Sequence, residues 1–147
     1  MSGEFLGTFT NSVNKSKWIT IPAAFKKKFS LNAKQQVIIT IGPENNIAIY
    51  PVDNWNHKIS KLKQGGERDT QLLLNLRTFA SAEQKLESTG RIKLSDELIE
   101  IAGIEKQVII KGEGTFISVW SPERYKQYRR KKLEEHQKTF NSLDYQE

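Results

Sequence analysis

The side chains best placed to do chemistry lie in residues 87–91, where an acid and an arginine are four positions apart around a glycine. The guanidinium of Arg91 could grip a phosphate or the edge of a guanine through two parallel hydrogen bonds. It could instead pair with Glu87 and hold the turn that Gly90 permits, since glycine accepts a positive φ and short-range ion pairs are common. Both roles are compatible, because the ion pair can orient the arginine until nucleic acid arrives.

A worn copy of this stretch lies in residues 14–18, if Trp18 is aligned with Arg91, 73 positions later. Lys15 and Lys17 fall in its turn, where side chains project freely and could contact phosphates without regard to sequence. The alternative is an exposed polar loop. DNA contacts are predicted from both turns and the strand after the second: Lys15, Ser16, Lys17, Ser88, Thr89, Arg91 and Lys93. We expect the two turns to emerge side by side as a cationic grip for a duplex.

The charge distribution fits a polyanionic partner. The 147 residues carry a net charge of +6, and residues 5–43 contain six lysines and no acidic residue. A field of one sign over the first quarter of the chain favours a polyanion such as DNA. A solvated, lysine-rich surface would give the same count, so charge alone leaves both interpretations open.

The composition argues against metal and redox chemistry. The chain has no cysteine, and its two histidines, His57 and His136, are far apart in sequence. Disulfides and thiolate metal ligands are therefore excluded, and a histidine metal site or catalytic triad is not expected. No metal and no cofactor are predicted.

The sequence does not indicate an enzyme. It shows no nucleophile–base pair and no phosphate loop, and residues 112–114 are interpreted as a hairpin turn. Glu83 and Glu87 could be imagined as a carboxylate pair, but ordinary surface acids are the simpler interpretation. No apolar run reaches the length of a membrane span, and the first residues lack a secretory signal. A cytoplasmic protein without a membrane or small-molecule partner is expected.

Short segments of strand and helix occur twice in the same order. Strands are expected at 5–10, 18–21, 37–41 and 47–50, and again at 81–86, 92–94, 107–110 and 117–120. Helices are expected at 22–29, 53–62, 70–79 and 95–102 and from Pro122 onward, with Asp69, Ser95 and Ser121 as caps. Corresponding segments are 70 to 73 positions apart, which indicates a duplicated unit. The predicted fold is mainly β with short helices (α+β), an interleaved barrel with a pseudo-two-fold within one chain.

The chain is expected to divide at the glycines of residues 64–68. Residues 1–63 form the first half, 64–80 a linker and connecting helix, 81–128 the second half, and 129–147 a charged C-terminal helix or tail. The lysines of residues 26–28 and the basic residues 129–132 are interpreted as solvated helix surface, with nucleic-acid contact as the minority alternative.

Apolar side chains beyond the barrel's needs are expected at subunit contacts. The middle helix carries four leucines, and we predict that it helps to form such a contact: Leu72, Leu73, Leu74 and Leu76. Five aromatic residues are predicted to pack in the core or at an interface: Trp18, Tyr50, Trp55, Trp120 and Tyr125.

The ordered set of motifs resembles the MraZ family. The matching pieces are Phe5-x-Gly7, residues 20–23 (Thr-Ile-Pro-Ala), Tyr50-Pro51 with Trp55, residues 102–106 and Trp120-Ser121 with residues 123–125. The resemblance implies the swapped-hairpin, double-split β-barrel of AbrB-type and SpoVT-type regulators. It also implies a bacterial transcription regulator at the nucleoid, which binds repeated promoter elements of the division and cell-wall gene cluster as a ring-shaped homo-oligomer.

The family carries an Asp-x-x-x-Arg signature in each half, and this chain departs from it. Asn14 and Trp18 stand where the first signature has Asp and Arg, whereas the second has Glu87 for Asp and keeps Gly90 and Arg91. The family's DNA-binding arginine therefore carries over to Arg91 alone. The alternative function is an oligomeric assembly or protein-interaction module in which specific DNA binding has weakened.

Overall fold

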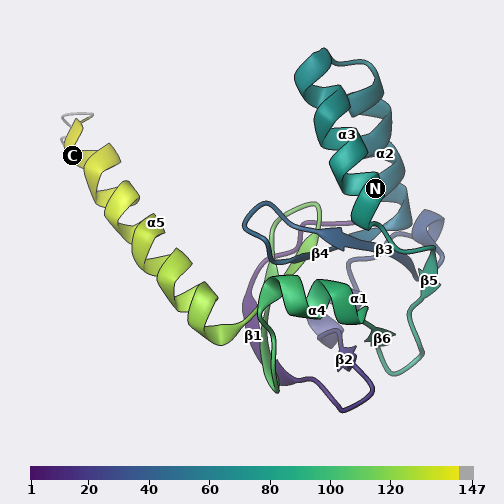
Figure 1. Ribbon diagram of the computed structural model, residues 1–147. Coiled ribbons are helices and arrows are strands. Elements are labelled where there is room, and N and C mark those ends of the chain that lie inside the picture. The colour runs from purple at the N-terminus through teal and green to yellow at the C-terminus, as the bar shows by residue number, and fades with distance from the viewer. Residues whose placement is uncertain (143–147) are drawn as a thin grey trace.

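The computed structural model describes residues 1–142 (Figure 1). The first half contains β1 (Thr8–Ser12), β2 (Trp18–Thr20), α1 (Ala23–Lys26), the 3₁₀ helix η1 (Leu31–Ala33), β3 (Gln36–Ile41), β4 (Ile47–Pro51) and α2 (Val52–Lys63). The remainder contains α3 (Glu67–Phe79), β5 (Gln84–Lys85), β6 (Arg91–Lys93), α4 (Asp96–Ala102), β7 (Gln107–Gly112), β8 (Ile117–Trp120) and α5 (Pro122–Ser142).

The strand order shows the internal duplication. One antiparallel sheet has the order β1-β7-β8-β4-β3-β5, and a second contains only β2 and β6. The strands β1 to β4 of the first half correspond to β5 to β8 of the second. If each strand is exchanged for its counterpart, the six-stranded sheet has the same order read backwards, and the β2–β6 pair maps onto itself. The predicted mainly β, short-helix fold with an internal pseudo-two-fold is confirmed. No closed barrel forms over residues 1–142, since the outer strands β1 and β5 do not pair with each other.

The strand register locates the pseudo-two-fold axis, because the axis passes where a residue pairs with its own counterpart from the other half. Ala48 lies opposite Ser118 where β4 meets β8, and Ile19 lies opposite Ile92 where β2 meets β6. Ile19 and Ile92 are 2% and 0% exposed and join the main apolar cluster. Each contributes roughly 1.5–3 kcal/mol by its burial. The short β2–β6 pair is therefore anchored through its inner face.

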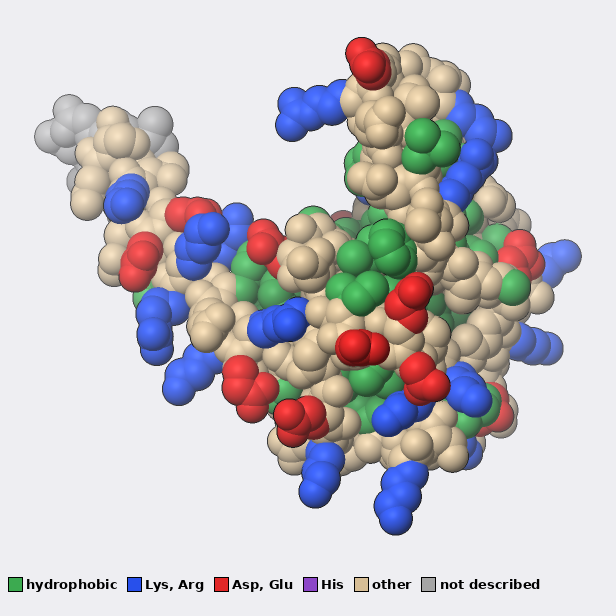
Figure 2. Space-filling model, in the orientation of Figure 1, with side chains coloured by type: hydrophobic (Ala, Val, Ile, Leu, Met, Phe, Trp, Pro, Cys, Tyr) green, Lys and Arg blue, Asp and Glu red, His purple; other side chains and the backbone are tan. Residues whose placement is uncertain are grey.

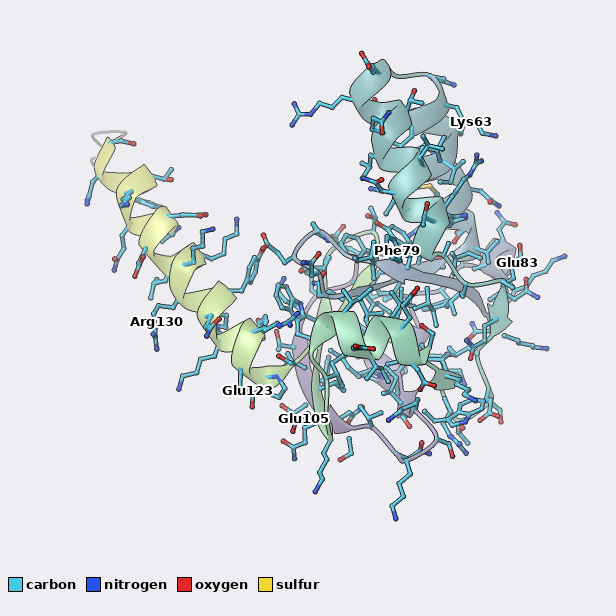
Figure 3. All side chains as sticks on the ribbon, in the orientation of Figure 1. Lys63, Phe79, Glu83, Glu105, Glu123 and Arg130 are labelled. Carbon is cyan, nitrogen blue, oxygen red and sulfur yellow. The ribbon has the colours of Figure 1, made fainter. Side chains whose placement is uncertain are left out.

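Two helical arms leave the β core. Helices α2 and α3 form a hairpin that stands off the sheet, and α5 extends away from the core elsewhere (Figure 1). The hairpin has its own small core of Ile59, Leu62, Leu73 and Leu76, with Trp55 against it. Figure 3 places Phe79 at the base of the hairpin, Lys63 toward its far end and Arg130 out on α5. The expected charged C-terminal helix is present through Ser142, and residues 143–147 of that expectation lie outside the described part.

Several element boundaries differ from the predictions. Gly7 has φ +111°, so regular pairing starts at Thr8, and Phe5 makes an isolated bridge to Gly114 instead. Regular pairing of the expected strand 81–86 is reduced to Gln84–Lys85. The expected helix 22–29 ends at Lys26, and the 3₁₀ helix that follows was not predicted. Asp69 lies in the first turn of α3 rather than at its cap, which is Gly66.

The aromatic predictions are confirmed for four residues and altered for one. Tyr50, Trp120 and Tyr125 are buried, and Trp55 packs against Tyr50 with ring centroids 5.5 Å apart. Trp18 lies on the outer face of β2 and is only partly buried. Alternation along a three-residue strand requires this, because Ile19 occupies the inner face.

Candidate nucleic-acid interface

The β2–β6 pair, which we call the ribbon, presents one apolar and one polar face. Its register pairs Trp18 with Lys93, Ile19 with Ile92 and Thr20 with Arg91. One further bond closes each end of the ladder, from Ile21 N to Gly90 O (2.8 Å) and from Leu94 N to Lys17 O (2.9 Å). Because side chains alternate, the isoleucines point into the core and the outer face carries the remaining four: Trp18, Thr20, Arg91 and Lys93.

The turns that precede β2 and β6 have the same backbone hydrogen bonds. In the first turn Asn14 N donates to Trp18 O (3.1 Å), and Lys17 N donates to Asn14 O (3.0 Å). In the second, Glu87 N donates to Arg91 O (3.1 Å) and Gly90 N to Glu87 O (2.7 Å). The Asn14 side chain also accepts a bond from Trp18 N at 2.9 Å. The departures from the signature therefore leave the geometry of the first turn intact.

The two turns flank the ribbon at opposite ends. The first lies beside Lys93 and the second beside Thr20, because β2 and β6 are antiparallel. Three residues of strand separate them, about 10 Å. The expectation that the two turns emerge side by side is therefore wrong, because the ribbon lies between them and they do not adjoin. All seven predicted DNA-contacting residues lie on this ribbon and its two turns.

Two side-chain amides hold the outer edges of the ribbon, and sequence reasoning missed both. Asn11 of β1 donates to Thr20 O at 2.7 Å. Gln84 of β5 donates to Lys93 O at 3.0 Å and accepts from Lys93 N at 2.7 Å. Asn11 and Gln84 are 73 positions apart, the same offset as Trp18 and Arg91. This shared offset between two amide residues is the sequence signal from which their matching roles could have been predicted.

A cationic depression lies at the first end of the ribbon. It has a volume of about 420 Å³ and is lined by Lys15, Ser16, Lys17, Lys93, Leu94, Ser95 and Asp96. Three lysines face one acid there. Lys93 lies on the strand that follows the second turn, as predicted, and the antiparallel register brings it to the lysines of the first turn.

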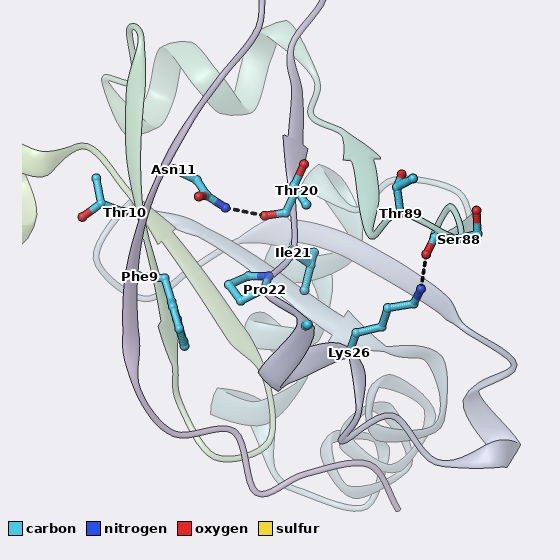
Figure 4. Close-up of a pocket in the computed structure, with 10 residues that line it drawn as sticks. Phe9, Thr10, Asn11, Thr20, Ile21, Pro22, Lys26, Ser88 and Thr89 are labelled. Atoms are coloured by element: carbon cyan, nitrogen blue, oxygen red, sulfur yellow. Dashed lines mark hydrogen bonds between the residues drawn. The ribbon is translucent and has the colours of Figure 1, made fainter.

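The pseudo-equivalent depression at the other end has a volume of about 450 Å³ and is less charged (Figure 4). Ser88 and Thr89 of the second turn line it together with Thr20 and Lys26. The ammonium group of Lys26 donates a hydrogen bond to Ser88 O, as the dashed line in Figure 4 shows. Lys26 was interpreted as solvated helix surface, whereas the structure sets it against the second turn.

Arg91 has two partners and remains accessible. Its Nε lies 3.7 Å from Glu87 Oε1, and the two side chains are 43% and 45% exposed. Its guanidinium carbon lies 4.8 Å from the centre of the Trp18 ring. An exposed ion pair contributes about 0–1 kcal/mol, so a phosphate or base can replace Glu87 at little cost.

The view in Figure 2 shows where charge gathers around this surface. Acidic side chains lie over α4, and lysine or arginine side chains project around the lower rim of the β core. Asp96, Glu97 and Glu100 are the acids of α4.

Within residues 1–142 no group of three or more His, Asp or Glu could hold a metal ion. None of the helices in this range has the length and apolar character needed to cross a membrane.

A second surface is apolar and lies between α3 and the β3–β4 turn. It is a groove of about 540 Å³, lined in part by Ile41, Leu72, Leu76, Phe79 and Phe116. Tyr50 and Lys58 also line it, and burial raises the pKa of Tyr50 to about 12 and lowers that of Lys58. Leu72 and Leu74 of α3 are 41% and 53% exposed.

Comparison with known proteins finds relatives over most of the chain. The family model described as "MraZ protein, putative antitoxin-like" matches residues 79–144. A protein of Syntrophomonas wolfei named "Transcriptional regulator MraZ" is 35% identical over 126 residues, which span 84% of this chain and 85% of that protein. Proteins of the same name from Alkaliphilus oremlandii and Thermomicrobium roseum are 31% and 29% identical. They cover 84% and 82% of this chain, and 85% and 84% of their own lengths.

Proposed function

The chain belongs to the MraZ family, and from this premise we propose that it is a DNA-binding transcriptional regulator rather than an enzyme. The family membership predicted from the sequence motifs is confirmed. The relatives described above are named as transcriptional regulators. We place the protein in the cytoplasm at the nucleoid, where the DNA lies.

The observation that carries the proposal is a two-stranded ribbon whose outer face is cationic and faces solvent. Arg91 and Lys93 stand on that face, and Lys15 and Lys17 stand in the turn beside it. The major groove of B-DNA admits a two-stranded β-ribbon. In this pose Arg91 meets base edges, whereas the remaining predicted residues contact phosphates: Lys15, Ser16, Lys17, Ser88, Thr89 and Lys93.

The proposal includes assembly into a ring-shaped homo-oligomer. The apolar groove, lined by the exposed Leu72, gives each subunit a surface that a second copy can cover. If this patch meets a different patch on the next subunit, the contact is heterologous, and it gives a ring when the rotation from one subunit to the next closes after a whole turn. A ring presents several ribbons, which suits repeated promoter elements of the division and cell-wall gene cluster. The two halves, 1–63 and 81–128, would supply the DNA-binding body, although α2 at the end of the first half leaves it to pair with α3 of the connecting segment 64–80. The charged C-terminal helix or tail, 129–147, is given no part in that body.

A mobility-shift titration with DNA from upstream of the protein's own gene, repeated over a salt series, tests the DNA assignment. The variant Lys15→Ala, Lys17→Ala is expected to bind more weakly. Its plot of log affinity against log salt should be less steep by about two units, since each phosphate contact contributes about 0.9. The matched control is Lys61→Ala, Lys63→Ala on α2, which should leave the slope unchanged. An unchanged slope in the turn variant would show that the surface is wrong.

The alternative, an assembly module with weakened specific DNA binding, is favoured by Asn14 and Trp18 at the first signature. It predicts an oligomer that gives no footprint on the upstream DNA. A protected region over that DNA at physiological salt would eliminate it.

A further inference from the structure

Trp18 and Arg91 are pseudo-equivalent residues that contact each other across the ribbon. Each follows its turn directly, and exchanging the two halves maps one onto the other. Trp18 pairs with Lys93 and Arg91 pairs with Thr20, so the two side chains are diagonal neighbours on the same outer face. The guanidinium carbon lies 4.8 Å from the ring centre, within the range of a cation–π contact.

The contact depends on the two positions being different. Two arginines here would place like charges on diagonal neighbours, which repel each other. A tryptophan offers a flat π face instead, which attracts the guanidinium and limits its orientations. Glu87 restrains the same group from the other side at 3.7 Å. Arg91 is thus held between an acid and an aromatic ring, although its side chain is 43% exposed.

The two ends of the ribbon also differ in charge. The end beside Trp18 carries three lysines from the first turn and β6. At the other end the second turn contributes the uncharged Ser88 and Thr89, with Lys26 bound to Ser88 O. Lysines suit phosphates, whereas arginine makes the bidentate contact that specifies guanine. The pseudo-symmetric scaffold therefore carries an asymmetric set of DNA-facing groups.

We propose that Trp18 is a positioning residue that holds the Arg91 guanidinium ready for a base, so that each subunit specifies bases through one arginine and makes its lysine–phosphate contacts at its Trp18 end. This rests on the proposed function and adds a division of labour between the two turns. It predicts one strongly specified guanine position per subunit instead of a two-fold related pair.

A double-mutant cycle on DNA affinity tests the role of Trp18. Trp18→Leu in the native background should weaken specific binding about two- to five-fold, the size expected from an exposed cation–π contact. Arg91→Ala should weaken it about ten- to hundred-fold and abolish the guanine preference. In the Arg91→Ala background, Trp18→Leu should have no further effect. Trp18→Phe keeps an aromatic face and should restore most of the native affinity. Thermal melting of each variant accompanies the titrations.

A selection from randomised DNA provides the second readout. The native protein should yield one strongly specified position per subunit, and Trp18→Arg should gain a second, related by the pseudo-two-fold. An equal loss from Trp18→Leu in both backgrounds would show a merely structural role, and an unchanged profile for Trp18→Arg would overturn the asymmetry. If the native protein itself does not bind DNA, the proposed function fails; if it binds but the cycle shows no coupling, only this inference fails.

Discussion

At the scale of single residues, the two turns each need a positive φ at the residue before the strand, and they meet this need with different residue types. Lys17 has φ +69° and Gly90 has φ +89° at equivalent positions. An L side chain in this region costs about 1–2 kcal/mol, and glycine avoids the cost. The first turn accepts the strain and gains a cation that faces the depression beside Lys93. The lysine at position 17 therefore costs backbone strain and adds positive charge to the surface.

Replacing Gly90 tests how closely the second turn is packed. A Cβ at this position would lie 2.9 Å from Ile21 O, which belongs to the backbone, and the positive φ adds strain. We expect Gly90→Ala to lower the free energy of unfolding by about 1–3 kcal/mol, measured by urea titration. The control Lys17→Gly should raise stability by up to about 1 kcal/mol and weaken DNA binding through the lost charge. A neutral Gly90→Ala would show that the ribbon end is loose.

Asp53 predicts an acid-sensitive attachment of the N-terminus. Partial desolvation raises the pKa of this carboxyl, but hydrogen bonds from Ser30, Ser2 and Asn54 outweigh it and the pKa falls below its usual value. A depressed pKa stabilises the fold above the unfolded-state value of about 3.9, and that stability is lost as the pH falls through the folded-state pKa. The melting temperature of the native protein should therefore drop in that window.

Two variants separate this carboxylate from general acid denaturation. Asp53→Asn should melt lower than the native protein at pH 6, with the difference shrinking below pH 4. Ser2→Ala, Ser30→Ala keeps the carboxylate without its two hydroxyl donors, so its acid transition should move to higher pH. Parallel melting curves for all three proteins from pH 2 to 6 would contradict the assignment.

The residue-level predictions succeeded where a side chain carried its own signal. Arg91 and Glu87 were identified from spacing alone, and they lie within 3.7 Å. Ser95 and Ser121 cap their helices as expected, accepting bonds from Leu98 N and Arg124 N at 3.1 Å. Lys26 was placed less well, because its partner is the carbonyl of Ser88, 62 positions away in the sequence.

At the scale of elements, the ribbon is too short to be stable by itself. Each strand has three residues, and an isolated two-stranded hairpin is marginal in water. Its position depends on the buried isoleucines and on the amides of Asn11 and Gln84. The sequence pattern showed the strands, but long-range pairing decided which edges the amides would cover.

Gln84 predicts a measurable change in the mobility of the ribbon. Gln84→Leu removes the acceptor of Lys93 N–H as well as the donor to Lys93 O. We expect a loss of about 0.5–1.5 kcal/mol and faster hydrogen exchange at the Lys93 amide, followed by NMR. Gln84→Glu keeps the acceptor and should preserve that protection. Equal exchange rates in the native protein and Gln84→Leu would show that the amide does not hold the ribbon.

At the scale of the whole molecule, the helical arms are the parts that the β core does not need. The hairpin buries its own small cluster, yet Leu72 remains exposed at an apolar groove, and Leu74 is exposed on another face of α3. The four leucines of the middle helix were predicted to serve a subunit contact, but Leu73 and Leu76 are buried in the hairpin's own cluster. The sequence could not show that α2 and α3 stand off the sheet as a pair (Figure 1), because that depends on how the hairpin packs.

Assembly and tight binding to repeated DNA elements should be lost together if the hairpin forms the subunit contact. Leu72→Lys places a charge in the apolar groove, Leu74→Lys adds one on another exposed face of the same helix, and the buried Leu73 and Leu76 stay untouched. The native protein should sediment above its 16.9 kDa chain mass, and the variant should sediment as a monomer at micromolar concentration. Because linked sites bind repeated elements with avidity, the monomer should bind the repeats about 10²–10⁴-fold more weakly while keeping its affinity for one isolated element.

The matched control adds charge to the same helix without removing apolar surface. Gln71 is exposed on α3, and Gln71→Lys should leave both sedimentation and avidity unchanged. A monomeric native protein would refute the subunit contact. A leucine variant that still assembles would move the contact elsewhere, and α5, which extends from the core with Leu133 58% exposed, would then be the next surface to test. A monomeric variant that retains full affinity for the repeats would separate assembly from DNA binding. The ribbon of a single subunit would then account for recognition by itself.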